Sequence, residues 1–339
     1  MEKSSKFDFQ GKLETLFQEG VIPEKEKTTL GSFFKSYVEA VEPCGIPASD
    51  YLPLFATYLD LIKREARHPY QFQPFHQHLL KPFDYYTFGI DFLKPLVEIE
   101  FSTVRGLDKL SQIEKTLAKK ENVILFANHQ IEADPQAISI LLEKSYPKLA
   151  ENLIFVAGER VITDLLAIPF SLGRNLLCIY SKRYIDFPPE EKHKKQLHNK
   201  NTMELMRELL NQGGKIIYVA PSGGRDRPNA AGIVEVAHFD PQSIEMFYLM
   251  SKKASKRTHF FPMALSTYNL LPPPETVQVE LGETRVTKRA AIHLAVGAEI
   301  DMESFPNRES KDKYVRRKSR ADYIWNLVKK DYDLFPGVT

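Results

Sequence analysis

Apolar segments of strand length alternate with helical segments from about residue 105 onward, and this alternation constrains the fold more than any other feature. Strands and helices that follow one another in this way are typical of an α/β sheet. Less helix separates the last strands, which predicts a sheet that is mixed but mostly parallel and flanked by helices. The expected strands are 123–126, 153–157, 175–180, 215–219, 259–265, 276–281 and 291–296, and the expected helices are 107–119, 135–144, 202–210 and 310–331.

The first 80 residues have a different pattern, with apolar residues at helical spacing in three segments. Glycines and prolines, Pro53 among them, punctuate these segments. We therefore expect a small N-terminal helical bundle, residues 1–80, followed by a larger α/β domain, residues 85–339, with the junction in the aromatic, proline-bearing stretch 71–92. His68, His76 and His78 near this junction are weak evidence for a metal, because no cysteine or carboxylate stands at ligand spacing.

His129 and Asp134 form an H-x-x-x-x-D pair where the strand 123–126 gives way to a helix. Residues five apart on a helix point away from each other, so the two side chains meet only if the backbone turns between them. Pro135, a favoured first helical residue, places the helix start just after Asp134. The pair predicts a general base and the carboxylate that orients it. The alternative is that Asp134 only caps the helix and His129 is a loop residue.

Basic residues follow two other strands. Arg225 and Arg227 end a glycine-rich turn, and guanidinium groups two residues apart on extended chain suit the oxygens of a phosphate monoester. After the strand 175–180 come Lys182, Arg183 and Tyr184, and the two cations among them add positive charge at what we expect to be the same sheet edge. For either cluster alone, the alternative is a solvated loop.

The chain resembles the soluble, chloroplast-type glycerol-3-phosphate acyltransferases in five blocks of matching order and spacing, which lie within residues 85–300. In that family the histidine is the base on the 1-hydroxyl of glycerol 3-phosphate and the aspartate orients it, which implies these roles for His129 and Asp134. The family's two phosphate-binding arginines correspond to Arg225 and Arg227. The blocks are 127–135 (ANHQIEADP), 155–161 (FVAGERV), 169–176 (PFSLGRNL), 220–228 (APSGGRDRP) and 261–265 (FPMAL).

The resemblance is incomplete at one site. A family Lys-His pair that also helps to bind the phosphate falls here on Arg183 and Tyr184, which keeps a cation but loses an imidazole. Lys182 is a further candidate beside them. Ser222 stands where the wider acyltransferase superfamily has a glutamate, a difference shared with the chloroplast type.

The resemblance implies a 1-O-acyltransferase that moves a fatty acyl group from acyl carrier protein, or from acyl-CoA, to glycerol 3-phosphate. The sequence has no G-x-S-x-G motif and no cysteine near the His-Asp pair, so direct transfer without an acyl-enzyme is the simpler mechanism, and this chemistry requires neither a metal nor another cofactor. Two other functions stay open: acylation of another phosphorylated alcohol such as lysophosphatidate, and a catalytically silent module that binds acyl carriers or lipids.

Composition agrees with an enzyme of this kind. The net charge of +2 in 339 residues does not indicate nucleic-acid binding, and two cysteines point to a reducing compartment. The first residues contain acids and resemble no targeting peptide, and the most apolar window, 161–180, contains Asp164, Pro169 and Arg174. We therefore expect no transmembrane segment, leave a peripheral membrane contact open, and expect the cytoplasm, or the plastid stroma for a plant protein whose transit peptide has been removed.

Basic residues also gather in three clusters. An acidic acyl carrier protein would be attracted to such a cluster, whereas the alternative is a set of solvated helix faces balanced by nearby acids. The clusters are 192–195, 252–257 and 316–320.

Overall fold

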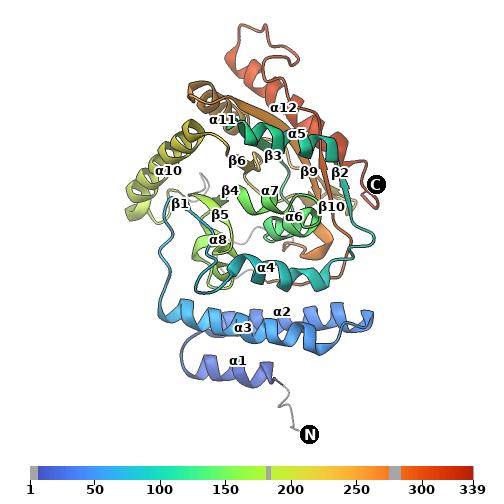
Figure 1. Cartoon of the computed structure of the whole chain (residues 1–339). Helices are drawn as coiled ribbons and strands as arrows, with labels where there is room; N and C mark the ends of the chain where they lie inside the picture. Colours follow the sequence, from blue (N-terminus) through green and yellow to red (C-terminus); the bar gives the residue numbers. More distant parts are fainter. Residues whose placement is uncertain (1–6, 181–184, 275–283, 339) are drawn as a thin grey trace.

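The structure, a computed structural model of the chain, describes residues 7–180, 185–274 and 284–338. A twisted sheet with helices on both faces forms the larger part, and three N-terminal helices lie together at one end of the molecule (Figure 1). This arrangement confirms the predicted fold class.

The sheet has the strand order β1-β5-β4-β6-β3-β9-β10-β2. Its five central strands, from β5 to β9, are parallel, whereas β1 and β10 run antiparallel to their neighbours β5 and β9. The edge strand β2 is parallel to β10. The sheet is therefore mixed but mostly parallel, as predicted. The bounds are β1 (Phe75–His76), β2 (Thr103–Arg105), β3 (Asn122–Ala127), β4 (Leu153–Gly158), β5 (Asn175–Ile179), β6 (Ile216–Val219), β9 (Thr258–Ser266) and β10 (His293–Val296), and β7 (Arg227–Pro228) pairs with β8 (Val234–Glu235) in a separate two-stranded sheet.

Parallel pairing brings the carboxyl ends of β3, β6 and β9 to one edge. Phe126 of β3 is in register with Val219 of β6, and Ala127 is in register with Met263 of β9. The loops that follow these strands are therefore neighbours, which is where open α/β sheets usually bind ligands.

Two groups of helices cover the two faces of the sheet. Strand β3 alternates between them: Ile124 and Phe126 pack on the side of α10, α11 and α12, whereas Val123 and Leu125 pack on the side of α5, α6 and α7. The bounds are α5 (Leu107–Ala118), α6 (Asp134–Leu142), α7 (Pro147–Asn152), α10 (Lys192–Gln212), α11 (Pro241–Lys253) and α12 (Lys313–Tyr332). Shorter helices are α8 (Arg160–Thr163), α9 (Ile168–Ser171), η1 (Glu42–Cys44), η2 (Lys94–Leu96), η3 (Pro189–Glu191) and η4 (Tyr268–Leu270).

The N-terminal helices α1 (Phe9–Gln18), α2 (Glu24–Val41) and α3 (Ala48–Arg67) share one apolar cluster with α4 (Tyr85–Leu93) and with one side of α6. Ala137 and Ile140 of α6 face this cluster, and Ile138 and Leu142 face the sheet. The helix that begins with Asp134 is thus buried from both sides. The division of the chain into domains 1–80 and 85–339 stays a prediction.

Two helices differ from the sequence-based expectations. Helix α3 continues through Pro53, which lies exposed in its second turn, where a proline removes one intrahelical hydrogen bond without ending the helix. Helix α10 begins ten residues before the predicted start at 202, because its first half is charged and solvent-exposed and so has no apolar period. The expected junction 71–92 holds the edge strand β1 and helix α4. The expected strand 276–281 lies outside the described residues.

In the described part of the chain, no helix combines the length and the hydrophobicity that crossing a membrane would require.

Candidate active site

The His129–Asp134 pair is formed as the sequence predicts. His129 follows the end of β3, α6 begins at Asp134, and His129 Nδ1 lies 2.8 Å from Asp134 Oδ2. The His129 side chain is 31% exposed whereas that of Asp134 is 1% exposed. The carboxylate is therefore held inside the protein while the imidazole reaches the surface of the site.

Asp134 accepts two further hydrogen bonds. The backbone N–H of Gln130 donates to Oδ2 (2.8 Å), and the hydroxyl of Thr267, just after β9, donates to Oδ1 (2.5 Å). Ala133 occupies the N-cap position of α6, and no side chain caps this helix. The alternative that Asp134 serves only as a cap is therefore wrong.

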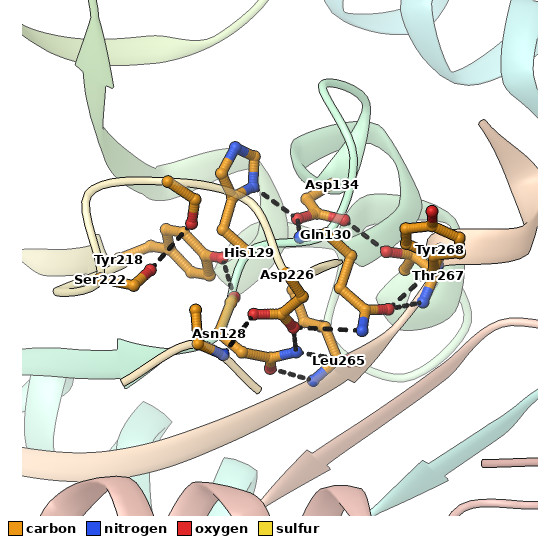
Figure 2. A network of polar contacts seen from close by, with 12 residues as sticks. Asn128, His129, Gln130, Asp134, Tyr218, Ser222, Asp226, Leu265, Thr267 and Tyr268 are labelled. Carbon is orange, nitrogen blue, oxygen red and sulfur yellow. Dashed lines mark hydrogen bonds and ion pairs between the residues drawn. The ribbon is translucent and has the colours of Figure 1, made fainter. Parts of the chain in front are cut away.

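These contacts decide which nitrogen of His129 carries the proton. An ionised carboxylate only accepts hydrogen bonds, so Nδ1 donates a hydrogen bond to Asp134, and in the neutral imidazole Nε2 then keeps its lone pair. Figure 2 shows the other ring nitrogen on the side of the imidazole away from Asp134. This is the geometry of a base and its orienting carboxylate.

Asn128 and Gln130, on either side of His129, fasten the loop to β9 and both are fully buried. Asn128 Nδ2 donates to the carbonyl of Leu265, and Asn128 Oδ1 accepts from the backbone N–H of Leu265, at 2.8 Å each. Gln130 Oε1 accepts from the backbone N–H groups of Thr267 (2.6 Å) and Tyr268 (3.0 Å). The position of the His129 backbone is thus set by the end of β9 (Figure 2).

Asp226, between the two candidate phosphate arginines, ties their loop to the histidine. It is fully buried, and its backbone N–H donates to the carbonyl of His129 (2.7 Å). Its Oδ2 accepts from Asn128 Nδ2 (2.7 Å) and Gln130 Nε2 (3.2 Å), and its Oδ1 accepts from the backbone N–H of Ala237 (2.9 Å). One buried carboxylate therefore joins the loop after β6 to the loop after β3.

Arg225 and Arg227 are half-buried and flank the buried Asp226. Arg227 begins β7, whereas Arg225 and Asp226 precede that strand, so the shared direction of the two guanidinium groups stays a prediction. Gly223 has a φ of +65°, a conformation that favours glycine. The turn before the arginines is closed by Ser222, whose hydroxyl donates to the carbonyl of Gly224 (2.8 Å).

The remaining site candidates have different outcomes. Lys182, Arg183 and Tyr184 lie outside the described residues, although β5, which leads to them, ends at the same edge as β3 and β6. His76 is buried, contacts Tyr70 Oη and the Leu172 carbonyl, and burial lowers the pKa of its imidazole to about 4. Within the described ranges, no three histidine, cysteine or acidic side chains are placed to hold a metal ion.

No sequence pattern predicted a role for Asn128, Gln130, Asp226 or Thr267. The first three stand directly beside predicted site residues, which was the available signal. Thr267 offered none, because its partner Asp134 is 133 residues away.

The buried carboxylate of Asp226 predicts a pH dependence of stability. Burial raises the pKa of Asp226 to about 6, although its three donors and the nearby His129 act to lower it. Because the folded state then binds a proton more tightly than the unfolded state, this group adds stability as pH falls through 6, and adds it fully below its unfolded pKa of about 3.9. Relative to Asp226→Asn, the wild-type free energy of unfolding should rise by about 1 kcal/mol from about pH 7.5 to pH 5. Denaturant unfolding of both proteins measures this, and parallel pH curves would contradict it.

Comparisons with known proteins identify the family of the chain. The acyltransferase family model matches residues 102–272. Chloroplastic glycerol-3-phosphate acyltransferases are similar over most of the chain. ATS12 of Cucurbita moschata is 38% identical over 88% of this chain and 65% of its own length, and the enzyme of Spinacia oleracea is 39% identical over 83% of this chain and 60% of its own length. The enzyme of Pisum sativum is 36% identical over 93% of this chain and 69% of its own length. The chain thus spans about 60 to 69% of the length of these relatives.

Among solved structures, the crystal structure of the 1-acyl-sn-glycerophosphate acyltransferase PlsC from Thermotoga maritima is 14% identical, with a TM-score of 0.40 over 97% of this chain and 96% of that one. This likeness is too distant to support an inference. The family model and the chloroplastic relatives are sufficient: the chain belongs to the acyltransferase family and, within it, to the glycerol-3-phosphate acyltransferases of the chloroplastic type.

Proposed function

We propose that this protein transfers a fatty acyl group from a thioester donor to the 1-hydroxyl of glycerol 3-phosphate. The observation that carries the proposal is the hydrogen bond from His129 Nδ1 to the buried carboxylate of Asp134, which leaves Nε2 as a base at the sheet edge shared with Arg225 and Arg227. The names of the chloroplastic relatives support glycerol 3-phosphate as the acceptor.

The chemistry requires a base more than an acid. A thioester releases a thiolate, whose conjugate acid has a pKa of about 8.5, so the leaving group needs little assistance. The alcohol must lose its proton as it attacks, and a positioned base contributes roughly 10² to 10⁴ in rate. In the proposed step His129 Nε2 takes the hydroxyl proton, the new C–O bond forms as the C–S bond breaks, and the imidazolium returns the proton to the thiolate. Asp134 stabilises that imidazolium.

The first prediction concerns the base. His129→Ala should lower kcat by roughly 10² or more, and Asp134→Asn should be nearly as harmful because an amide at this position favours the wrong imidazole tautomer. Transfer of a labelled acyl group to glycerol 3-phosphate measures both, with circular dichroism to confirm folding.

Two outcomes would contradict this assignment. Near-normal turnover by folded His129→Ala would show that His129 is not the general base. Wild-type protein that acylates lysophosphatidate but not glycerol 3-phosphate, or that binds acyl donors without turnover, would favour one of the two other functions named above.

The second prediction concerns the phosphate. Each arginine should donate charge-assisted hydrogen bonds worth roughly 1.5 to 3 kcal/mol, so Arg225→Ala or Arg227→Ala should raise KM for glycerol 3-phosphate about tenfold or more. KM for the acyl donor should change little. Unphosphorylated glycerol provides an independent check, and equal reaction of glycerol and glycerol 3-phosphate would show that these arginines bind no phosphate.

We also propose acyl carrier protein as the donor, with acyl-CoA as the alternative, in the cytoplasm or the plastid stroma. Cys44 and Cys178 are both free thiols, which suits a reducing compartment. Lys182 and Arg183, with Tyr184 beside them, stay candidates for the phosphate.

Of the three basic clusters, 192–195 is the best placed to receive an acidic carrier. Helix α10 follows β5 in the chain and ends shortly before β6 begins. Its last turn therefore lies near the start of β6, and its first turn lies towards the sheet edge that carries His129. The clusters 252–257 and 316–320 lie towards the opposite edge, because α11 ends where β9 starts and α12 begins after the antiparallel strand β10. Within 192–195, Lys194 is exposed, whereas Lys195 is buried and donates to the carbonyl of Phe187.

The third prediction therefore compares two exposed lysines. Lys194→Glu should raise KM for acyl carrier thioesters at low ionic strength about tenfold or more, whereas Lys253→Glu, the same change at the opposite edge, should not. Added salt should weaken the wild-type preference for the carrier, because screening removes the attraction. Acyl-pantetheine, which lacks the acidic protein, is the control donor. Equal effects of the two substitutions would contradict docking at α10.

A further inference from the structure

A buried ion-pair cluster contacts the loop between His129 and Asp134, which we call the catalytic loop. Arg285 Nε and Nη2 donate to the two carboxylate oxygens of Glu132 at 3.0 and 3.1 Å, and Nη2 also donates to Asp164 Oδ2 at 2.9 Å. The side chains of Arg285 and Asp164 are each 8% exposed, and that of Glu132 is 22% exposed. One guanidinium thus binds two carboxylates, which we call the Arg285 clamp.

Each carboxylate of the Arg285 clamp belongs to a different part of the molecule. Glu132 lies in the turn between His129 and Asp134, whereas Asp164 follows α8 and accepts a hydrogen bond from the backbone N–H of Leu166 (2.8 Å). The carbonyl of Leu166 accepts from the hydroxyl of Tyr58 on α3 (2.7 Å). The clamp therefore joins the apex of the catalytic loop to the α8–α9 connection and, through it, to the N-terminal helices.

Hydrogen bonds also hold the backbone of the segment that carries Arg285. Two residues further on, the backbone N–H of Thr287 donates to Ser36 Oγ on α2 (3.0 Å), and the backbone N–H of Lys288 donates to the carbonyl of Leu270 (3.0 Å). Arg285 thus reaches the catalytic loop from a fixed backbone position. Burial acts to lower the pKa of Arg285, but the charges of Glu132 and Asp164 outweigh it and hold that pKa well above its usual value, so the guanidinium is ionised.

A buried ion pair is an inefficient means of stabilising a fold, because apolar side chains of similar volume often serve as well. What the planar guanidinium provides is a fixed direction for each hydrogen bond. A loop that must bring residues five apart into contact benefits from such a constraint, because a misplacement of about 1 Å of a reacting group can lower a rate by 10².

We propose that Arg285 is a positioning residue, which holds the loop between His129 and Asp134 in its reactive geometry by gripping Glu132. The proposal rests on the proposed role of His129 as the base. Arg285 is almost fully buried and acts through Glu132, so it does not touch the substrate.

The test detaches the loop from the clamp with the smallest possible change. Glu132→Gln keeps the volume of the side chain and leaves the Arg285–Asp164 pair in place. Its matched control is Glu98→Gln, because Glu98 pairs with Arg289, four residues from Arg285, at 3.1 Å and lies outside the catalytic loop. We expect Glu132→Gln to lower kcat about tenfold or more with less than about a threefold change in KM for glycerol 3-phosphate. Glu98→Gln should keep kcat within about twofold.

Arg285→Lys is the second variant. It keeps a cation between the two carboxylates, which preserves folding, but loses the fork that grips Glu132. Its kcat should fall between those of the wild type and Glu132→Gln. A kcat equal to that of the wild type would show that charge alone suffices and would overturn the positioning role.

A double-mutant cycle with His129 separates positioning from general stability. If the clamp acts through the base, Glu132→Gln should lower the residual rate of His129→Ala by less than about twofold. The same loss in both backgrounds would overturn the proposal, as would full kcat in Glu132→Gln, or a raised KM for glycerol 3-phosphate with unchanged kcat. Near-normal turnover of His129→Ala would instead overturn the proposed function.

Discussion

The structure of the site depends on the three hydrogen bonds that the buried carboxylate of Asp134 accepts. An ionised carboxylate in the interior is stable only when it is well hydrogen-bonded, and its donors come from His129, from the backbone of Gln130 and from Thr267. These donors follow the ends of two different strands, β3 and β9. The register of these strands and the start of α6 must therefore all be correct before His129 acquires its orientation.

The rest of the site extends outward from that carboxylate in two directions. Towards β6, Asp226 joins the histidine loop to the arginines that we assign to the phosphate, so the base and the anion site share one buried network. Towards the N-terminal helices, Glu132 joins the same loop to Arg285. A catalytic side chain on a loop requires such support from neighbouring residues, because the loop alone does not fix it. The N-terminal helices, which contribute no proposed catalytic group, reach this network through Tyr58 and Ser36.

Sequence patterns predicted those features of the fold and the site whose residues lie close together in the chain. The central strands and the turn between His129 and Asp134 were predictable, because apolar period, Pro135 and the strand end are local signals. The positions of Thr267 and Arg285 were not, because their partners Asp134 and Glu132 lie 133 and 153 residues away. The first half of α10 was missed for a different reason: an exposed helix of charged residues carries no apolar period.

The proposed function requires that Asp134 holds His129 with a proton on Nδ1 and a lone pair on Nε2. Nitrogen-15 NMR of the protein with labelled histidine measures this directly, since protonated and unprotonated ring nitrogens differ widely in chemical shift, and His129→Ala assigns the signal. At about pH 8, where an ordinary imidazole is neutral, we expect a protonated Nδ1 and an unprotonated Nε2 for His129. A protonated Nε2, or a mixture of both tautomers as in a free imidazole, would contradict it.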